Sequence, residues 1–104
     1  MRTLLLALLV FAAAPAWGEA PARRSGPDIV RDTCALCHGP GIGGAPRIGD
    51  ARAWRKRAGS GIEALVRSAS AGKGAMPPRG GMPDLDEDEL RAAIAYMAGF
   101  PNGR

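Results

Sequence analysis

The chain has 104 residues, of which 23% are charged and only 5% aromatic, and its formal net charge is +4 at pH 7. This length excludes a multidomain protein and leaves room for only a modest hydrophobic core. Small domains of this kind usually gain stability from disulfides, a metal or another bound hydrophobic body. The charge indicates a mildly basic surface, and we expect no nucleic-acid partner.

The N-terminal residues have the pattern of a secretory signal peptide. Arg2 is basic, an apolar run extends from Leu4 to Ala14, and small residues follow. The run falls well short of the roughly 20 residues that a membrane-spanning helix needs, so an uncleaved anchor is the less favoured interpretation. We therefore predict a signal peptide over residues 1–20 with cleavage near 18–20, a mature domain over 21–104, and export to the periplasm without stable membrane insertion.

Helical patterns dominate the mature chain, and no alternating run is long enough for a strand. A first helix is predicted from near Pro27, which suits the first helical position, into the cysteines. A shorter helix from Asp50 to Ala58 presents Trp54.

Two further helices follow. The first of them is predicted to have Ser60 as N-cap, Glu63 completing a capping box, and Gly72 at its end. Its apolar face consists of Ile62, Leu65, Val66 and Ala69.

The last helix has the clearest pattern in the chain. Asp86 is its N-cap, Glu89 completes a capping box, and Gly99 ends it. We expect Tyr96 and Ile94 to pack against Ile29 and Val30 where the terminal helices cross. The apolar stripe consists of Leu90, Ala93, Ile94 and Met97.

Residues 34–38 read CALCH and contain both cysteines and the only histidine. Such a motif is half of a zinc site, a dithiol redox switch, or a c-type haem attachment site. Zinc would need a carboxylate to complete its four ligands. A redox dithiol belongs at a helix N-terminus near a βαβ unit, whereas this motif follows a helical segment. Haem attachment explains every member, because Cys34 and Cys37 each bond a vinyl group and His38 becomes the proximal iron ligand.

The Gly- and Pro-rich segment 72–83, GKGAMPPRGGMP, is predicted to supply the second axial ligand. We call it the strap. Met76 is favoured, because two prolines hold the chain extended after it and the glycines let the backbone pass close to a flat macrocycle. Met82 and an open or water-ligated iron are the alternatives. Met97 is interpreted as a core residue.

Four segments in this order carry a family resemblance: CALCH (34–38), GAPRIGD (44–50) with Trp54 after it, GKGAMPPRGG (72–81) and LDEDELRAAIAYMAG (85–99). Together they resemble the class I c-type cytochromes, and more narrowly the short bacterial cytochrome c-five group. The resemblance implies an all-α cytochrome c fold, with three main helices and a short one packed around one covalently bound haem c, and His/Met ligation. It also implies that the Pro46 carbonyl accepts a hydrogen bond from the His38 ring. The chain departs from that group in having no second cysteine pair.

Several other residues have two open interpretations. Trp54 is either a core residue or, as in related cytochromes, a donor to a haem propionate. Arg47 either pairs with the propionates or is solvated. A basic stretch is typical of a solvated helix face, while docking to an acidic redox partner is the sharper hypothesis. This basic stretch consists of Arg52, Arg55, Lys56 and Arg57.

An iron with both axial positions filled changes by one electron and does not readily bind oxygen. We therefore predict a monomeric electron carrier, not an enzyme, which exchanges electrons with redox protein partners such as a terminal oxidase or a dehydrogenase. Two alternatives stay open. One is a ligand-binding or sensor cytochrome with an open sixth position, and the other is the haem-bearing small subunit of a periplasmic dehydrogenase.

Overall fold

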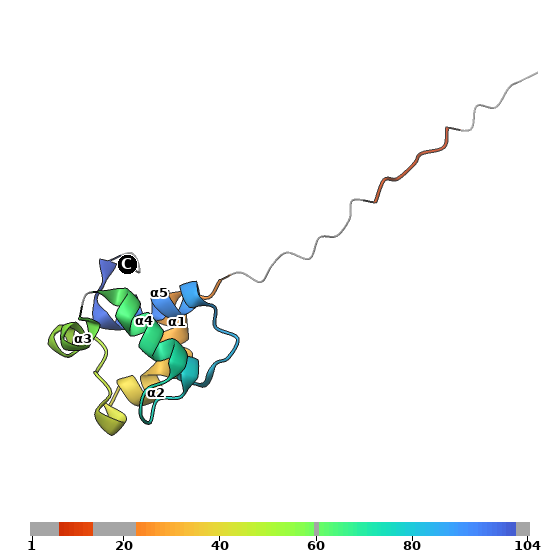
Figure 1. Ribbon diagram of the computed structural model, residues 1–104. Helices are drawn as coiled ribbons and strands as arrows, with labels where there is room; N and C mark the ends of the chain where they lie inside the picture. Colours follow the sequence, from red (N-terminus) through yellow and green to blue (C-terminus); the bar gives the residue numbers. More distant parts are fainter. Residues whose placement is uncertain (1–6, 14–22, 60, 102–104) are drawn as a thin grey trace, which may run out of the picture.

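Helices form the fold in the part of the chain that the structure describes, which is residues 7–13, 23–59 and 61–101 of a computed structural model. In chain order the elements are α1 (Gly26–Ile29), a π-helical turn η1 (Val30–Cys34), α2 (Ala35–His38), a 3-10 turn η2 (Ile42–Gly44), α3 (Ala51–Ala58), α4 (Ile62–Ala71), a 3-10 segment η3 (Pro78–Gly81) and α5 (Glu87–Ala98) (Figure 1). Within these ranges an isolated bridge between Lys73 and Met76 is the only β pairing. The predicted all-α fold of three main helices and a short one is confirmed, since α1, η1 and α2 follow one another without a break.

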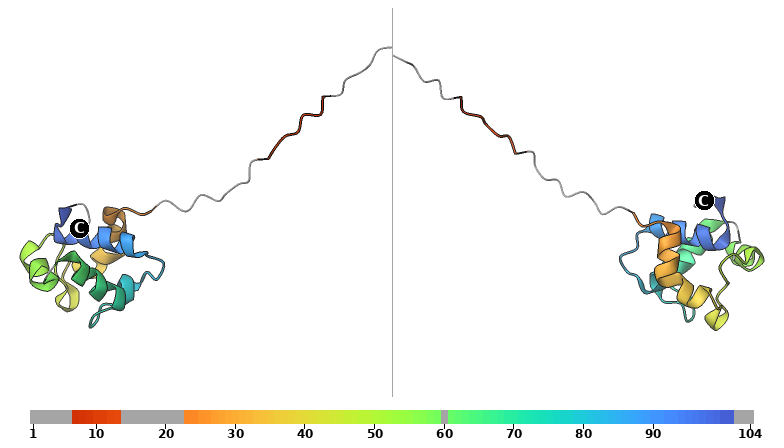
Figure 2. Two further views of the ribbon diagram at one scale, coloured as in Figure 1. Left: turned by 45° about the horizontal axis from the view of Figure 1, so that its top comes forward. Right: turned by 180° about the vertical axis from the view of Figure 1, so that it is seen from behind.

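The first helical run begins where the sequence predicts. Ser25 is the N-cap, its hydroxyl accepts a hydrogen bond from the Asp28 amide at 3.3 Å, and Pro27 lies in the first turn. The backbone is still right-handed helical at Val30 and at Ala35, so the run continues through the wider turn of η1. Figure 2 shows it from behind as one rod, coloured orange to yellow. The CALCH motif occupies its last turns, so this rod sets the spacing of the cysteines and the histidine.

The predicted start and end of α5 are both confirmed. The Asp86 side chain accepts from the Glu89 amide at 2.7 Å, and the Glu89 side chain accepts from the Asp86 amide at 3.2 Å. This reciprocal pair satisfies two backbone donors that have no partner within the helix. Gly99 ends the helix in the left-handed region, with φ 78°.

The start of α4 differs from the prediction. The predicted cap residue Ser60 lies outside the described residues, and α4 begins at Ile62 with Gly61 as its N-cap and no side-chain cap. Glu63 serves another purpose than a capping box, because it accepts two hydrogen bonds from Arg91 of α5, at 2.7 and 2.9 Å. The same guanidinium holds the pKa of Glu63 below its ordinary value. The end at Gly72 is as predicted.

One hydrophobic core joins the first run, α3, α4 and α5. Its buried members are Ile29, Val30, Trp54, Ala58, Ile62, Leu65, Val66, Ala69, Leu85, Leu90, Ala93, Ile94, Ala95, Met97 and Ala98. The apolar faces predicted for α4 and α5 are therefore confirmed, and Met97 is a core residue. The terminal helices cross at Gly26, where a Cβ atom would lie 2.4 Å from the Ala92 carbonyl oxygen. Ile94, Ile29 and Val30 belong to this core, whereas Tyr96 is 52% exposed and its packing against the first helical run stays a prediction.

An ion-pair cluster fastens the segment before α1 to the start of α5. The Glu89 carboxylate, 6% exposed, accepts from the backbone amide of Arg24 at 3.0 Å and from its Nε at 2.8 Å. The guanidinium of Arg24 is the main reason why the pKa of Glu89 falls from about 4.5 to about 2. Arg23 adds pairs to Asp86 at 3.3 Å and to Asp88 at 3.0 Å. This cluster ties residue 23 onward to the folded body.

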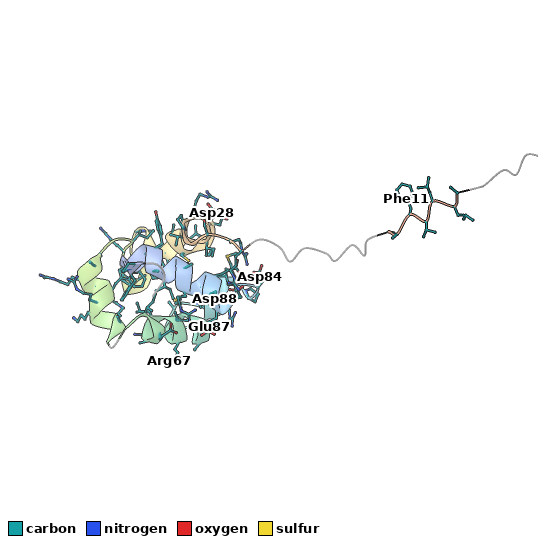
Figure 3. All side chains as sticks on the ribbon, turned by 90° about the horizontal axis from the view of Figure 1, so that it is seen from above. Phe11, Asp28, Arg67, Asp84, Glu87 and Asp88 are labelled. Carbon is teal, nitrogen blue, oxygen red and sulfur yellow. The ribbon has the colours of Figure 1, made fainter. Side chains whose placement is uncertain are left out.

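Residues 7–13 take no part in the core. Leu8, Leu9, Val10 and Phe11 are each more than 80% exposed, and Phe11 lies well away from the helices in Figure 3. Among the residues described, no helix is both long enough and apolar enough to cross a membrane.

Candidate haem-binding site

His38 is placed at the end of the first helical run, with 8% of its surface exposed. Its Nδ1 lies 2.8 Å from the carbonyl oxygen of Pro46. A carbonyl oxygen only accepts, so Nδ1 carries the ring proton and Nε2 keeps a free lone pair. The chain comes close to His38 again at Ile48, whose amide donates to the His38 carbonyl at 3.0 Å. The histidine is thus fixed in orientation and in tautomer, as a metal-ligating imidazole requires.

The two cysteines lie one helical turn apart on the same run. They form no disulfide with each other; Cys34 is half-buried and Cys37 is exposed. Burial raises the pKa of the Cys34 thiol above its ordinary value. A redox dithiol needs the opposite, a lowered pKa that keeps one sulfur as thiolate. The motif also lies in the last turns of a helical run and not at its N-terminus, so the structure does not favour a dithiol switch.

A zinc site has no support among the described residues. No three His, Cys, Asp or Glu side chains of that part of the chain gather closely enough to hold a metal ion. The motif would contribute three ligands at most, whereas a structural zinc site takes four.

Residues 73–76 of the strap form a tight loop, and the chain is extended at Pro77 before η3 begins. The amide of Lys73 donates to the Met76 carbonyl at 3.0 Å and the amide of Met76 donates to the Lys73 carbonyl at 2.9 Å. Pro77 is extended after it, with φ −68° and ψ 157°, as predicted from the proline pair. Met76 and Met82 are both partly buried and pack against the core, so the choice between them as ligand stays a prediction.

Trp54 reaches the site from α3. It is 4% exposed, and its indole ring stacks on the His38 ring with centroids 5.2 Å apart and planes inclined by 25°. Its indole N–H donates to the Arg47 carbonyl at 2.8 Å. Trp54 is therefore a core residue in this structure, and the predicted propionate contact, which would require this N–H to change partner, stays a prediction. The Arg47 residue is exposed, and its role toward a propionate also stays untested.

Two contacts near the site were not predicted. Arg57 donates to the Gly44 carbonyl at 3.0 Å and fastens the end of α3 to the segment that follows the motif. Thr33 Oγ1 donates to the Gly80 carbonyl at 3.3 Å and joins the first helical run to the strap. Both acceptors are backbone oxygens far along the chain, and no local pattern of residue types identifies such a partner.

The chain is similar to known proteins. Residues 21–97 match the family model described as "Cytochrome C oxidase, cbb3-type, subunit III". Cytochrome c5 of Azotobacter vinelandii is 45% identical over 79 residues, which cover 74% of this chain and 95% of that protein. Cytochrome c5 of Ectopseudomonas mendocina is 46% identical over 79 residues, covering 74% and 91%. A chain in the crystal structure of an electron transfer complex of nitrite reductase with cytochrome c is similar with a TM-score of 0.66 and 46% identity, covering 71% of this chain and 90% of that chain.

The chain therefore belongs to this family of small class I c-type cytochromes. As such it carries one covalently bound haem c with iron and acts in electron transfer. Within the class it is similar to the cytochromes c5, which confirms the resemblance that the sequence motifs indicate.

Proposed function

We propose that this cytochrome is a periplasmic one-electron carrier in which haem c is bonded to Cys34 and Cys37 and is ligated by His38 and Met76. The observation that carries the proposal is the 2.8 Å contact from His38 Nδ1 to Pro46 O, because it leaves Nε2 as the free lone pair of the ring. When bound, the haem supplies an iron centre that gains and loses one electron. Two cysteines that are not in a disulfide, ahead of the histidine, and a half-buried thioether on the strap make a donor set that fits this cofactor.

Each residue contributes a positioning or shielding effect. The Pro46 carbonyl accepts a hydrogen bond from His38 Nδ1. This makes the other ring nitrogen, Nε2, a stronger electron-pair donor to a metal. The Met76 thioether would supply a soft, neutral ligand, which favours the reduced state of the iron. Trp54 covers the face of the imidazole and keeps water away from it. The chain thus supports electron carriage and not a chemical conversion of a substrate.

The ligand assignment is tested by optical spectra of the oxidised and reduced holoprotein. The wild-type ferric protein is expected to show the weak far-red methionine-to-iron band, and the reduced protein is expected not to bind carbon monoxide. Met76→Ala should remove the band and allow carbon monoxide to bind, whereas Met82→Ala, from the same strap, should change neither. If Met82→Ala removes the band and Met76→Ala keeps it, the ligand is Met82.

The export proposal concerns residues 1–20. It is supported by the apolar residues Leu8 to Phe11, which are exposed and belong to no core, and by the fastening of Arg24 to the domain. Intact mass and N-terminal sequencing of the protein from its native host are expected to show a mature chain that begins after residue 18 or 20 and carries the mass of one haem. A chain that retains Met1 would contradict the cleavage.

Charge separates the two ends of the domain and suggests how partners dock. Asp84, Glu87 and Asp88 gather at one end in Figure 3, and α3 lies at the other. Ion pairs from Arg23, Arg24 and Arg91 offset that acidic end. The exposed bases of α3 take part in no ion pair among the described residues. These bases are Arg52, Arg55, Lys56 and Arg57, of which Arg57 donates to the Gly44 carbonyl.

We propose that this face of α3 docks an acidic surface of a redox protein. Trp54, on the buried side of α3, stacks on the His38 ring, so α3 lies between this face and the histidine. Exposed charges on a docking face mainly change the rate at which the two proteins associate. The similar cytochrome in complex with nitrite reductase supports a redox enzyme as the kind of partner.

The docking proposal is tested with the nitrite reductase of that complex as the partner. The second-order rate of electron transfer is measured against salt concentration for Arg55→Gln and for its control Arg67→Gln, an exposed arginine of α4. Arg55→Gln is expected to slow the reaction at low salt, with the difference lost near 1 M salt, where the screening length is about 3 Å. Equal effects of the two variants would show that only net charge matters.

A further inference from the structure

A side-chain hydrogen bond links the two segments that the proposed function places on opposite faces of the haem. Thr33, immediately before Cys34, donates from its hydroxyl to the carbonyl of Gly80 at 3.3 Å. Gly80 lies on the strap, just beyond Met76. The bond therefore connects the helical run that carries His38 directly to the segment that carries the methionine.

The helix around Thr33 is unusual. A threonine hydroxyl inside a regular helix commonly bonds the carbonyl four residues back on its own helix. Thr33 lies in the π-helical turn η1, where the Ala35 amide reaches back to the Val30 carbonyl. Its hydroxyl instead leaves the helix for the strap. Single π turns of this kind occur frequently at functional sites.

The strap needs external contacts to keep its shape. Arg79 has φ 55° and ψ 30°, the only positive φ of a non-glycine residue in the described part of the chain. A left-handed conformation is unfavourable for a residue that has a Cβ atom. Two interactions oppose this cost: the Arg79 guanidinium donates to the Leu85 carbonyl, and the Met82 amide donates to the Arg79 carbonyl at 3.1 Å. Both interactions lie within the strap and the residues just after it. Thr33 adds a hydrogen bond from a separate element, the first helical run.

We propose that Thr33 is a positioning residue that holds the strap closed against the first helical run and thereby keeps the methionine ligand in place. The inference rests on the proposed ligation by Met76. Replacing Thr33 by a residue without a hydroxyl removes one neutral hydrogen bond. The half-buried Gly80 carbonyl must then bond water instead. Such a bond contributes about 0.5–1.5 kcal/mol, which corresponds to a two- to tenfold increase in opening of the strap.

The first test does not depend on which residue ligates the iron. Amide hydrogen exchange is measured by NMR on the reduced holoprotein for wild type, Thr33→Val, Thr33→Ser and Ser68→Ala, an exposed hydroxyl of α4 that serves as control. Thr33→Val should accelerate exchange of the Gly80 and Met82 amides about two- to tenfold, because both report local opening of the strap. Thr33→Ser and Ser68→Ala should match wild type. Unchanged exchange in Thr33→Val, or acceleration in Ser68→Ala as well, overturns the inference.

The second test measures the consequence for the ligand. Binding of imidazole to the ferric protein requires the methionine to leave, so its rate reports strap opening when methionine is bound. Thr33→Val should bind imidazole faster by the same factor while the resting far-red band is retained, and Thr33→Ser should restore the wild-type rate. If Thr33→Val binds imidazole no faster than wild type, or Thr33→Ser behaves as Thr33→Val does, a role for the hydroxyl in positioning is refuted.

The two proposals fail in different ways. A wild-type protein without the far-red band refutes His/Met ligation, whatever Thr33→Val does to amide exchange. A wild-type protein with the band, and with exchange and imidazole binding that are insensitive to Thr33→Val, refutes only the role of Thr33.

Discussion

Replacing Gly26 by alanine tests the crossing of the terminal helices. A Cβ atom at this position would lie 2.4 Å from the Ala92 carbonyl oxygen and 2.8 Å from the Ala92 carbonyl carbon, and real Cβ atoms essentially never come within 3.0 Å of another heavy atom. Both neighbours are backbone atoms of α5, so no side-chain rotation relieves the clash and α1 must move away from α5. Shifts of this kind in a packed core typically cost about 1–3 kcal/mol.

The sign of the effect separates two explanations. Helix propensity alone favours alanine over glycine by up to about 1 kcal/mol, so without the close contact Gly26→Ala would stabilise the protein. The crossing predicts a lower free energy of unfolding and a melting temperature reduced by roughly 5–20 °C. The assay is guanidinium and thermal unfolding of the holoprotein followed by circular dichroism, with Gly26→Val expected to lose more than Gly26→Ala. An unchanged or raised stability of Gly26→Ala would refute the packing argument.

Two more predictions follow from single contacts. Because Arg24 lowers the pKa of Glu89 from about 4.5 to about 2, the ionised carboxylate stabilises the fold above pH 4.5 and this contribution is lost as the pH falls toward 2. Acid unfolding curves should therefore show that Glu89→Gln is less stable than wild type at pH 6 and that the gap closes toward pH 2; a gap independent of pH would contradict the linkage. Trp54→Phe removes the indole donor to Arg47 O and should lower the free energy of unfolding by about 0.5–1.5 kcal/mol while the far-red band persists. Loss of the band in that variant would mean that Trp54 acts on the ligand itself.

Much of the local structure was predictable from neighbouring residues. The capping box of α5 needs only Asp86 and Glu89, three positions apart, and the end at Gly99 needs only the conformational freedom of glycine. The periodic apolar faces of α4 and α5 were likewise correct, because helix geometry brings residues three and four apart to one side. The same holds for the motif of residues 34–38, whose chemistry depends on ligands within two turns of one helix.

Other features depend on residues that only folding brings together. The close approach of Gly26 to the Ala92 carbonyl depends on how α1 and α5 cross, which no local pattern encodes. Glu63 has the right spacing for a capping box, yet Arg91 of α5 offers it a charged partner from another helix.

The sequence by itself determined the class of this protein, because haem attachment and helix capping are set by residue types at short, fixed spacings. The tertiary structure alone decided how the strap is held and how the N-terminal segment is fastened. Thr33 and Gly80 are 47 residues apart, and Arg24 and Glu89 are 65 apart. Contacts over such separations arise from how the helices pack in three dimensions, and no local pattern of side chains encodes them.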